Sequence, residues 1–300
     1  MFSNEQPVIL LTGVNGQVGF ELARSLQGLG RVVALDRGTL DLTDLQEIRS
    51  TIRRLKPSLI VNPAAYTAVD KAEVDEAAAF ALNAEAPGVI AEEAKRLDIP
   101  MVHYSTDYVF DGTGSGAYVE DDQPNPQNVY GKSKLAGERA IVESGCAHLI
   151  FRTSWVYGAR GKNFLLTMLR LGAERECLDV VADQYGAPTW ANTVAVVTAH
   201  VLAQAMVKAE GERKAWWRTY SGLYHLTASG ATSWHGFATA IFELSALSKK
   251  PVIQQIGAAS YATPARRPVN SVMSNEKLAR AFGVRPPDWR DALQLCLQTP

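Results

Sequence analysis

Three polar side chains near the middle of the sequence have the types and the spacing needed to transfer a proton to a carbonyl oxygen. Tyr130 and Lys134 lie four residues apart at the start of a predicted helix, so both project from one face. A phenol has a pKa of about 10, and a neighbouring ammonium group lowers that value toward neutral pH. Thr106 follows a predicted strand 24 residues before Tyr130, where its hydroxyl can hold a substrate oxygen. The trio predicts that Tyr130 acts as a general acid on a ketone.

The hydroxyl partner of this acid has one alternative. Ser105 immediately precedes Thr106, and alternation along a strand lets only one of the two side chains face the site. A tyrosine and a lysine at this spacing also occur by chance on many helix surfaces. The prediction therefore depends on the upstream hydroxyl, and it assigns catalysis to Tyr130, Lys134 and Thr106 together.

A glycine-rich turn between the first predicted strand and the first predicted helix has the pattern of a dinucleotide-binding loop. Gly13, Gly16 and Gly19 permit a tight turn, a close approach to a pyrophosphate, and close packing of helix on strand. The helix that follows offers free N–H groups to the phosphates. Asp36 ends the second strand 23 residues after Gly13, where a carboxylate can bond ribose hydroxyls. Arg37 follows and can neutralise a 2′-phosphate, so NADPH and NADH are both expected cofactors.

Other polar and aromatic residues are placed to bind the rest of a substrate. Asp107 and Tyr108 leave the sheet just after Thr106 and can bond sugar hydroxyls. Trp155 follows the fifth strand and offers a flat face to a sugar or nicotinamide ring; the alternative is a rim aromatic that packs the second lobe. Arg266 and Arg267 lie between prolines and suit a diphosphate. Their alternative is a solvated basic turn or an ion pair between lobes.

The elements that must position these residues follow an α/β pattern. Apolar runs alternate with helical periodicity, as a doubly wound parallel sheet covered on both faces requires. Residues 1–155 are predicted to form the NAD(P)-binding core, and residues 156–300 mainly a smaller, substrate-binding lobe, with some later segments crossing back. The expected strands are 8–12, 31–36, 59–62, 101–105 and 149–153, and the expected helices include 17–29, 44–55, 73–97 with a break near Pro87, and 130–143.

Composition excludes several classes of protein. The 300 residues contain 30 Lys and Arg against 31 Asp and Glu, and no block of like charges, which argues against nucleic-acid and membrane-surface partners. No apolar run is long enough to span a bilayer, and the first residues do not resemble a secretion signal. Three widely spaced cysteines predict reduced thiols in a cytoplasmic protein. His103 is expected to be a core residue, and the other histidines have no metal-binding spacing.

Together these motifs resemble the dTDP-4-dehydrorhamnose reductase family of extended short-chain dehydrogenase/reductases, over nearly the whole chain. The resemblance implies Tyr130 as proton donor, Lys134 as its partner and Thr106 as the aligning hydroxyl. It also gives predicted substrate contacts at Val69, Thr106, Asp107, Tyr108 and Trp155. The predicted cofactor contacts, from spacing and resemblance together, are Gly13, Gly16, Gln17, Val18, Gly19, Asp36, Arg37, Asp41, Leu42, Ala64, Ala65, Tyr66, Tyr130 and Lys134.

Some relatives bind Mg²⁺ through carboxylates near a dimer contact. Glu21 matches one such position, but Asn192 stands where another carboxylate is expected. No metal ion is therefore predicted, with Glu21 the one candidate ligand, and a homodimer is left open.

The activity that the resemblance implies is NAD(P)H-dependent reduction of the C4 ketone of dTDP-4-dehydro-β-L-rhamnose to dTDP-β-L-rhamnose. One alternative is a reductase or epimerase of another deoxyhexulose nucleotide, because the same trio serves those enzymes. Asp107-Tyr108 rather than a pair of acids after Thr106 argues against a dehydratase. Another alternative is a regulatory protein, because the β subunit of methionine adenosyltransferase resembles this family.

Overall fold

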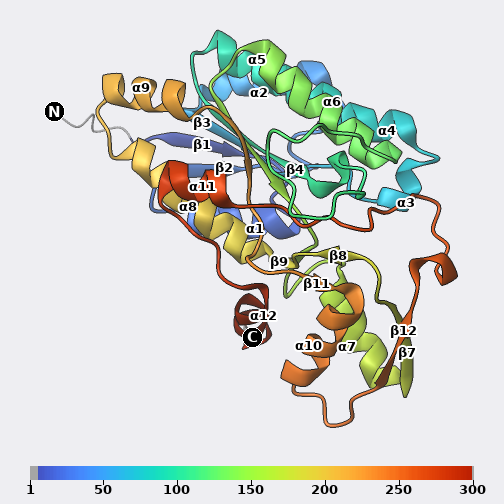
Figure 1. The fold of residues 1–300 in the computed structure, drawn as a ribbon. Helices are drawn as coiled ribbons and strands as arrows, with labels where there is room; N and C mark the ends of the chain where they lie inside the picture. The colour runs from blue at the N-terminus through green and yellow to red at the C-terminus, as the bar shows by residue number, and fades with distance from the viewer. Residues whose placement is uncertain (1–5, 299–300) are drawn as a thin grey trace.

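A parallel six-stranded sheet forms the centre of the molecule in the computed structural model, which describes residues 6–298 (Figure 1). The strand order is β10-β5-β4-β3-β1-β2, and every neighbouring pair is parallel. The doubly wound sheet predicted from the sequence is thus confirmed. Its strands are β1 (Val8–Leu11), β2 (Arg31–Ala34), β3 (Leu59–Asn62), β4 (Met101–Thr106), β5 (His148–Thr153) and β10 (Gly222–His225).

Helices cover both faces because successive side chains of each strand point to opposite sides. Ile9 and Leu11 face a cluster with α1, α8, α9 and α11, whereas Leu10 faces a cluster with α2, α5 and α6. Figure 1 shows α2, α5 and α6 above the sheet and α1, α8 and α11 below it. The covering helices are α1 (Gln17–Ser25), α2 (Leu45–Leu55), α5 (Ala86–Arg96), α6 (Val129–Ser144), α8 (Ala191–Met206), α9 (Glu210–Tyr220) and α11 (Glu276–Phe282).

A smaller lobe hangs from the carboxyl edge of the sheet and has its own apolar cluster (Figure 1). Tyr157 and Phe237 lie at its centre, and β7 pairs in parallel with β12. The lobe contains α7 (Phe164–Glu174), β7 (Cys177–Val181), α10 (Trp234–Leu244), β12 (Val252–Ile256) and α12 (Trp289–Gln298), with short strands β6 (Val156–Tyr157), β8 (Tyr185–Gly186), β9 (Thr189–Trp190) and β11 (Thr232–Ser233).

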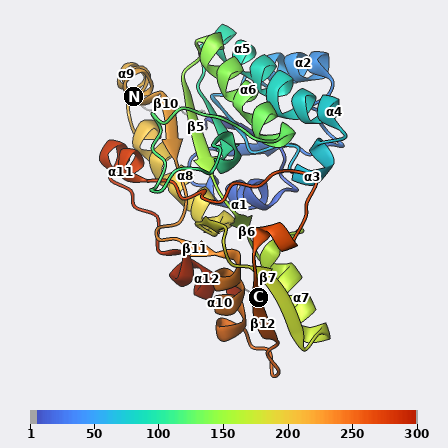
Figure 2. The same ribbon diagram turned by 45° about the vertical axis from the view of Figure 1, so that its right-hand side comes forward.

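The chain passes between sheet and lobe several times. After β12 it passes η3 (Ala258–Ser260), rises to α3 (Val69–Ala72) and then crosses the front of the sheet to α11 (Figure 2). The edge strand β10 and the helix α9 were not predicted from the sequence. Both come from the second half of the chain, so that half contributes to the central sheet as well as to the lobe.

The helix expected over 73–97 differs in detail from the prediction. It begins as α4 (Glu76–Phe80), widens into a π-helical segment (Ala81–Glu85) and continues as α5. Pro87 does not break it: the helix runs through this residue, which comes directly after the π-helical segment where the hydrogen-bond pattern shifts from the α-helical one. Among residues 6–298, no helix has the length and apolar character that a membrane crossing requires.

Candidate active site

A hollow of about 670 Å³ opens where β1, β3, β4 and β5 end. Open α/β sheets bind their ligands at this carboxyl edge. Most residues predicted for the site meet here, although they come from separate parts of the chain. The predicted residues that line the hollow are Gly13, Gly16, Gln17, Val18, Gly19, Ala64, Ala65, Val69, Thr106, Asp107, Tyr108, Tyr130, Lys134 and Trp155.

The glycine loop forms one wall of the hollow and could not hold its shape with larger residues. Gly13 has φ +58°, and a Cβ there would lie 2.8 Å from Ala64 Cα. A Cβ on Gly19 would lie 2.2 Å from the Gly13 carbonyl oxygen, so helix and strand touch there. Because α1 begins at Gln17, its free N–H groups face the same wall. This cradle fits a dinucleotide pyrophosphate.

The predicted adenosine contacts lie beyond the hollow, at the turn after β2. The Asp36 carboxylate accepts hydrogen bonds from Thr39 and from the backbone N–H of Gly38, and Asn15 of the glycine loop donates to it at 3.2 Å. These bonds, led by Thr39, lower the pKa of Asp36. Arg37 beside it is exposed. Two further predicted contacts lie in the same turn: Asp41, whose carboxylate accepts from Thr43, and the buried Leu42.

Tyr130 and Thr106 approach each other as the sequence predicted, because α6 packs beside the end of β4. Burial raises the pKa of Tyr130 to about 12, and hydrogen bonding with Thr106 acts in the opposite direction. The Thr106 hydroxyl donates to Asp107 Oδ1 at 2.9 Å. Tyr108 stands edge-on to the Tyr130 ring, with centroids 5.5 Å apart. The phenol is therefore neutral at physiological pH in this structure.

Lys134 lies deeper than its helical spacing suggested. Its Nζ donates to the Tyr104 carbonyl at 2.6 Å and lies 3.2 Å from His103 Nε2. Burial lowers the pKa of Lys134 to about 8, and Glu138 on the same helix raises it. We expected the ammonium to lower the pKa of Tyr130, but burial is the largest influence on that phenol, since Lys134 points toward β4.

The Asp107 carboxyl is the other strongly perturbed group at this edge. It is 2% exposed, and burial raises its pKa to about 6, although Ser271 and Thr106 hydrogen bonds lower it. Nearby, the hydroxyls of Ser105 and Thr153 are buried and have no hydrogen-bond partner among residues 6–298. Buried orphan hydroxyls at a ligand edge fit a polar ligand that would complete their bonding.

Trp155 lines the hollow and also joins the two lobes. Its ring stacks on Trp234 of α10, with centroids 3.5 Å apart and an angle of 4° between the planes. Its backbone has φ +48°, a conformation that L residues rarely adopt. One face of the indole is therefore covered by the lobe, as the packing interpretation expects, and contact with a sugar or nicotinamide ring stays a prediction.

Arg266 and Arg267 do not line the hollow. Arg267 pairs with Asp70 of α3 at 2.8 Å, and Asp70 also accepts the backbone N–H of Ala265. Arg266 is exposed and lies 3.4 Å from Gln127. The two arginines therefore anchor the segment that crosses from the lobe to α3.

Sequence reasoning missed Asn83, which holds the loop after β3 against α6. Its side chain bonds the backbone N–H and carbonyl of Tyr66 and donates to the Ser133 hydroxyl at 3.0 Å. The predicted contact Tyr66 turns its hydroxyl to Asp75. The available signal was a lone asparagine in an alanine-rich helix, at the place where the helix widens.

A second missed segment closes the hollow over the glycine loop. Gly161 and Lys162 line it, and Asn163 donates to Gln17 Oε1 at 2.8 Å. Arg160 stacks over the Phe20 ring of α1 at 3.4 Å. A basic, glycine-containing turn just after β6 was the signal in the sequence.

The candidate metal ligand Glu21 bonds an amide instead of gathering other carboxylates. Asn192 Nδ2 donates to Glu21 Oε2 at 3.0 Å. Within the described part of the chain, no group of three or more His, Cys, Asp or Glu side chains could hold a metal ion. These residues do not fit an ion at this position.

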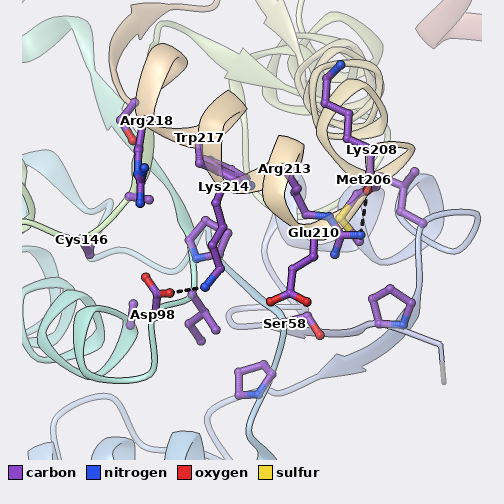
Figure 3. A pocket seen from close by; sticks show the side chains of 18 of the residues that line it. Ser58, Asp98, Cys146, Met206, Lys208, Glu210, Arg213, Lys214, Trp217 and Arg218 are labelled. Carbon is purple, nitrogen blue, oxygen red and sulfur yellow. Dashed lines mark hydrogen bonds and ion pairs between the residues drawn. The ribbon is translucent and has the colours of Figure 1, made fainter. Parts of the chain in front are cut away.

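A larger hollow, about 1290 Å³, lies at the opposite, amino edge of the sheet (Figure 3). The helix α9 crosses it, and Lys214 of that helix pairs with Asp98 at 2.6 Å. Lys95 and Arg218 also line it. No residue predicted for the site is among its lining residues in the described chain.

Comparison with known proteins places this geometry in one family. The family model for the RmlD substrate binding domain matches residues 7–300. The dTDP-4-dehydrorhamnose reductase of Burkholderia thailandensis is 53% identical over 297 residues, 97% of this chain and 98% of that protein. The chain belongs to the dTDP-4-dehydrorhamnose reductase family. The family resemblance stated from the motifs is thus confirmed.

Other members of the family agree over the same extent. The dTDP-4-dehydrorhamnose reductase of Salmonella typhimurium is 45% identical over 292 residues, 94% of each chain. A crystal structure of the Bacillus anthracis family member in complex with NADP has a TM-score of 0.89 and 31% identity, and covers 98% of this chain and all of that one. Sheet and lobe are therefore both shared with the family.

Proposed function

We propose that this protein reduces the C4 ketone of dTDP-4-dehydro-β-L-rhamnose to the hydroxyl of dTDP-β-L-rhamnose, with NADPH or NADH as reductant. The observation that carries the proposal is that Tyr130, Thr106 and Lys134 all line the hollow that the glycine loop borders. Family membership over the whole chain supports the substrate assignment.

Each member of the trio has a separate task. The nicotinamide cofactor, when bound, supplies the hydride for C4 of the sugar. Tyr130 gives its phenolic proton to the ketone oxygen as that oxygen gains charge. Thr106 donates to Asp107 Oδ1 at 2.9 Å in this structure, and with substrate bound its hydroxyl would turn that hydrogen to the ketone oxygen and hold it. Lys134, once charged, stabilises the phenolate that Tyr130 leaves behind.

The remaining assignments are proposals of the same kind. The glycine loop and the turn at Asp36 and Arg37 would hold the cofactor phosphates and ribose, and Val69, Tyr108 and Trp155 the sugar nucleotide. We also propose that the part before residue 156 mainly binds cofactor while the later part mainly binds substrate. Three free cysteines among the described residues support a cytoplasmic location. Analytical ultracentrifugation would test for a homodimer.

Product identification is the decisive experiment. The protein is incubated with the dTDP-linked 4-keto sugar and NADPH, and the product is identified by NMR. We expect dTDP-β-L-rhamnose with one equivalent of NADPH oxidised. A C4 epimer of rhamnose would indicate a sister reductase, and no oxidation of either cofactor would favour a regulatory protein. Either result contradicts the proposal.

A further inference from the structure

A row of buried polar side chains crosses three neighbouring strands beneath the carboxyl edge. Thr12 follows the last residue of β1, Asn62 ends β3, and His103 lies directly opposite Asn62 on β4. By strand alternation all three continue the face of Leu10, on which α6 packs. The row ends at Lys134 of α6, and each of the four residues is at most 2% exposed.

The contacts along this row are continuous. The Thr12 hydroxyl donates to Asn62 Oδ1 at 2.5 Å, and Asn62 Nδ2 lies 3.2 Å from His103 Nδ1. His103 Nε2 lies 3.2 Å from Lys134 Nζ. The sequence analysis took His103 for a core histidine, but its second nitrogen touches the catalytic amine.

A neutral imidazole has one N–H, which decides what the row can do. When Asn62 donates to Nδ1, the ring hydrogen lies on Nε2 and points at Lys134, an arrangement that suits the uncharged amine. When the Asn62 carboxamide turns by half a rotation, its oxygen accepts from Nδ1–H. Nε2 is then free to accept from the Lys134 ammonium. The Thr12 hydroxyl can serve either arrangement because it both donates and accepts.

The buried Lys134 amino group is surrounded by few groups that can stabilise its charge. Its charge is opposed by burial and helped by Glu138 of its own helix, while Tyr104 of β4 supplies a carbonyl and His103 a ring nitrogen. Burial and the Lys134 charge keep the pKa of His103 well below its usual value, so the ring stays neutral. Glu138 itself is engaged with Arg152 in a buried bidentate pair.

We propose that His103 is a positioning residue that holds the Lys134 amino group in both of its charge states, with Asn62 as the rotating element that matches the ring to each state. This inference rests on the proposed function for the role of Lys134 in catalysis. It concerns the chain's own residues. The change of Lys134 from ammonium to amine releases one proton to the solvent of the hollow that Lys134 lines, and the ring hydrogen of His103 moves from Nδ1 to Nε2. The role is distinct from that of Thr106, which acts on the substrate oxygen.

The test is the pH dependence of kcat and of NADPH binding in three variants. Asn62→Asp offers only acceptor oxygens, so it keeps the ring hydrogen on Nδ1 and favours the ammonium. We expect the alkaline limb of the plot of kcat against pH to shift by about one unit to higher pH. His103→Phe removes the acceptor and should shift the alkaline limb by about one unit to lower pH, so that kcat is about tenfold lower at pH 8. His103→Gln keeps a polar partner for Lys134, so its alkaline limb should lie close to that of the wild type.

A matched control is available at the other end of the sheet. His148 is also buried, but it bonds the Cys146 carbonyl at the start of β5. His148→Phe should leave the limb in place, although it removes the same ring from a comparable environment. Thermal unfolding of each variant shows whether the fold is intact.

The inference is overturned if folded Asn62→Asp and His103→Phe proteins keep the wild-type limb, or if His148→Phe moves it equally. Should His103→Phe not fold, Asn62→Asp decides alone. The Kd for NADPH between pH 7 and 10, measured by nicotinamide fluorescence, must shift in the same directions. If the protein turns over no keto-sugar nucleotide, that result contradicts only the proposed function. The NADPH-binding measurement still tests the role of His103.

Discussion

The two edges of the sheet hold two hollows of very different character. The amino-edge hollow is about twice as large, 1290 against 670 Å³, yet its charges lie on exposed side chains (Figure 3). There Lys214 and Asp98 pair in solvent, with 48% and 79% of their side chains exposed. At the carboxyl edge Lys134 is 1% and Asp107 2% exposed. Within the described part of the chain, only this smaller hollow has a buried carboxyl and a buried amino group in its lining; the buried ionisable group of the larger hollow is the Cys146 thiol, whose pKa burial raises.

Helix direction explains the difference between the edges. Helices that follow parallel strands begin at the carboxyl edge, where their N–H groups and positive dipole ends attract anions. They end at the amino edge, where cations such as Lys95 at the end of α5 offset the negative dipole ends. The basic side chains of the larger hollow thus have a structural explanation. The buried carboxyl and amino groups, rather than the size of the hollow, are the reason for placing the proposed site at the carboxyl edge.

The largest expected effect is at the carboxyl edge. Tyr130→Phe removes only the hydroxyl that would protonate the ketone, so kcat should fall about 10²–10⁴-fold. Steady-state kinetics with the keto-sugar nucleotide measures this, and unchanged NADPH affinity serves as the control. Retention of more than about a third of wild-type turnover would remove Tyr130 from the acid role.

A second prediction concerns how far the buried Asp107 carboxylate lowers the free energy of unfolding. Asp107 has its pKa raised from 3.8 to about 6, so the folded state binds its proton more tightly than the unfolded state. Its contribution to stability therefore falls as pH rises from about 4 to about 6, and stays low above that. At about 1.36 kcal/mol per unit, Asp107→Asn should stabilise the protein at pH 7 by up to ~3 kcal/mol.

Urea unfolding at pH 7 and pH 4 checks this prediction. The gain should be present at pH 7 and absent at pH 4, where Asp107 is neutral in the folded state. Asn keeps an oxygen for the Thr106 hydroxyl, so that bond is not lost. An equal loss of stability at both pH values would show that packing, rather than charge burial, dominates at this position.

A smaller effect is expected at the exposed outer end of the cofactor site. Asp36 favours a free ribose hydroxyl and Arg37 a 2′-phosphate, and exposed charges of this kind give only a modest bias. We expect kcat/KM for NADPH and NADH to agree within about tenfold. Asp36→Ala should shift the preference toward NADPH and Arg37→Ala toward NADH. A wild-type preference above about a hundredfold would require a buried contact instead.

The smallest effect is predicted for the amino edge. Lys214→Ala breaks the exposed pair with Asp98, and such pairs contribute little. Both kcat/KM and the melting temperature should stay close to those of the wild type. A clear loss of turnover would mean that the larger hollow participates in function, which would break the distinction between the two edges.

Much of this site could be predicted because its signals are local. Glycine spacing, the four-residue interval from Tyr130 to Lys134 and the hydroxyl after a buried run each depend on one short segment. Strand β3 lies at the predicted residues 59–62. The covering helix near Pro87 was predicted less well, because the π-helical widening depends on how Asn83 meets α6 and the loop after β3.

The amino-acid sequence by itself determined the parallel sheet, the glycine cradle and the three residues proposed for catalysis, since hydrophobic period and backbone freedom act between near neighbours in the chain. Only the tertiary structure decided that Lys134 turns to His103, that Trp155 stacks on Trp234 and that Arg267 pairs with Asp70. Each of those contacts joins residues from different elements. Their partners are set by strand order, register and helix docking, which no single segment encodes.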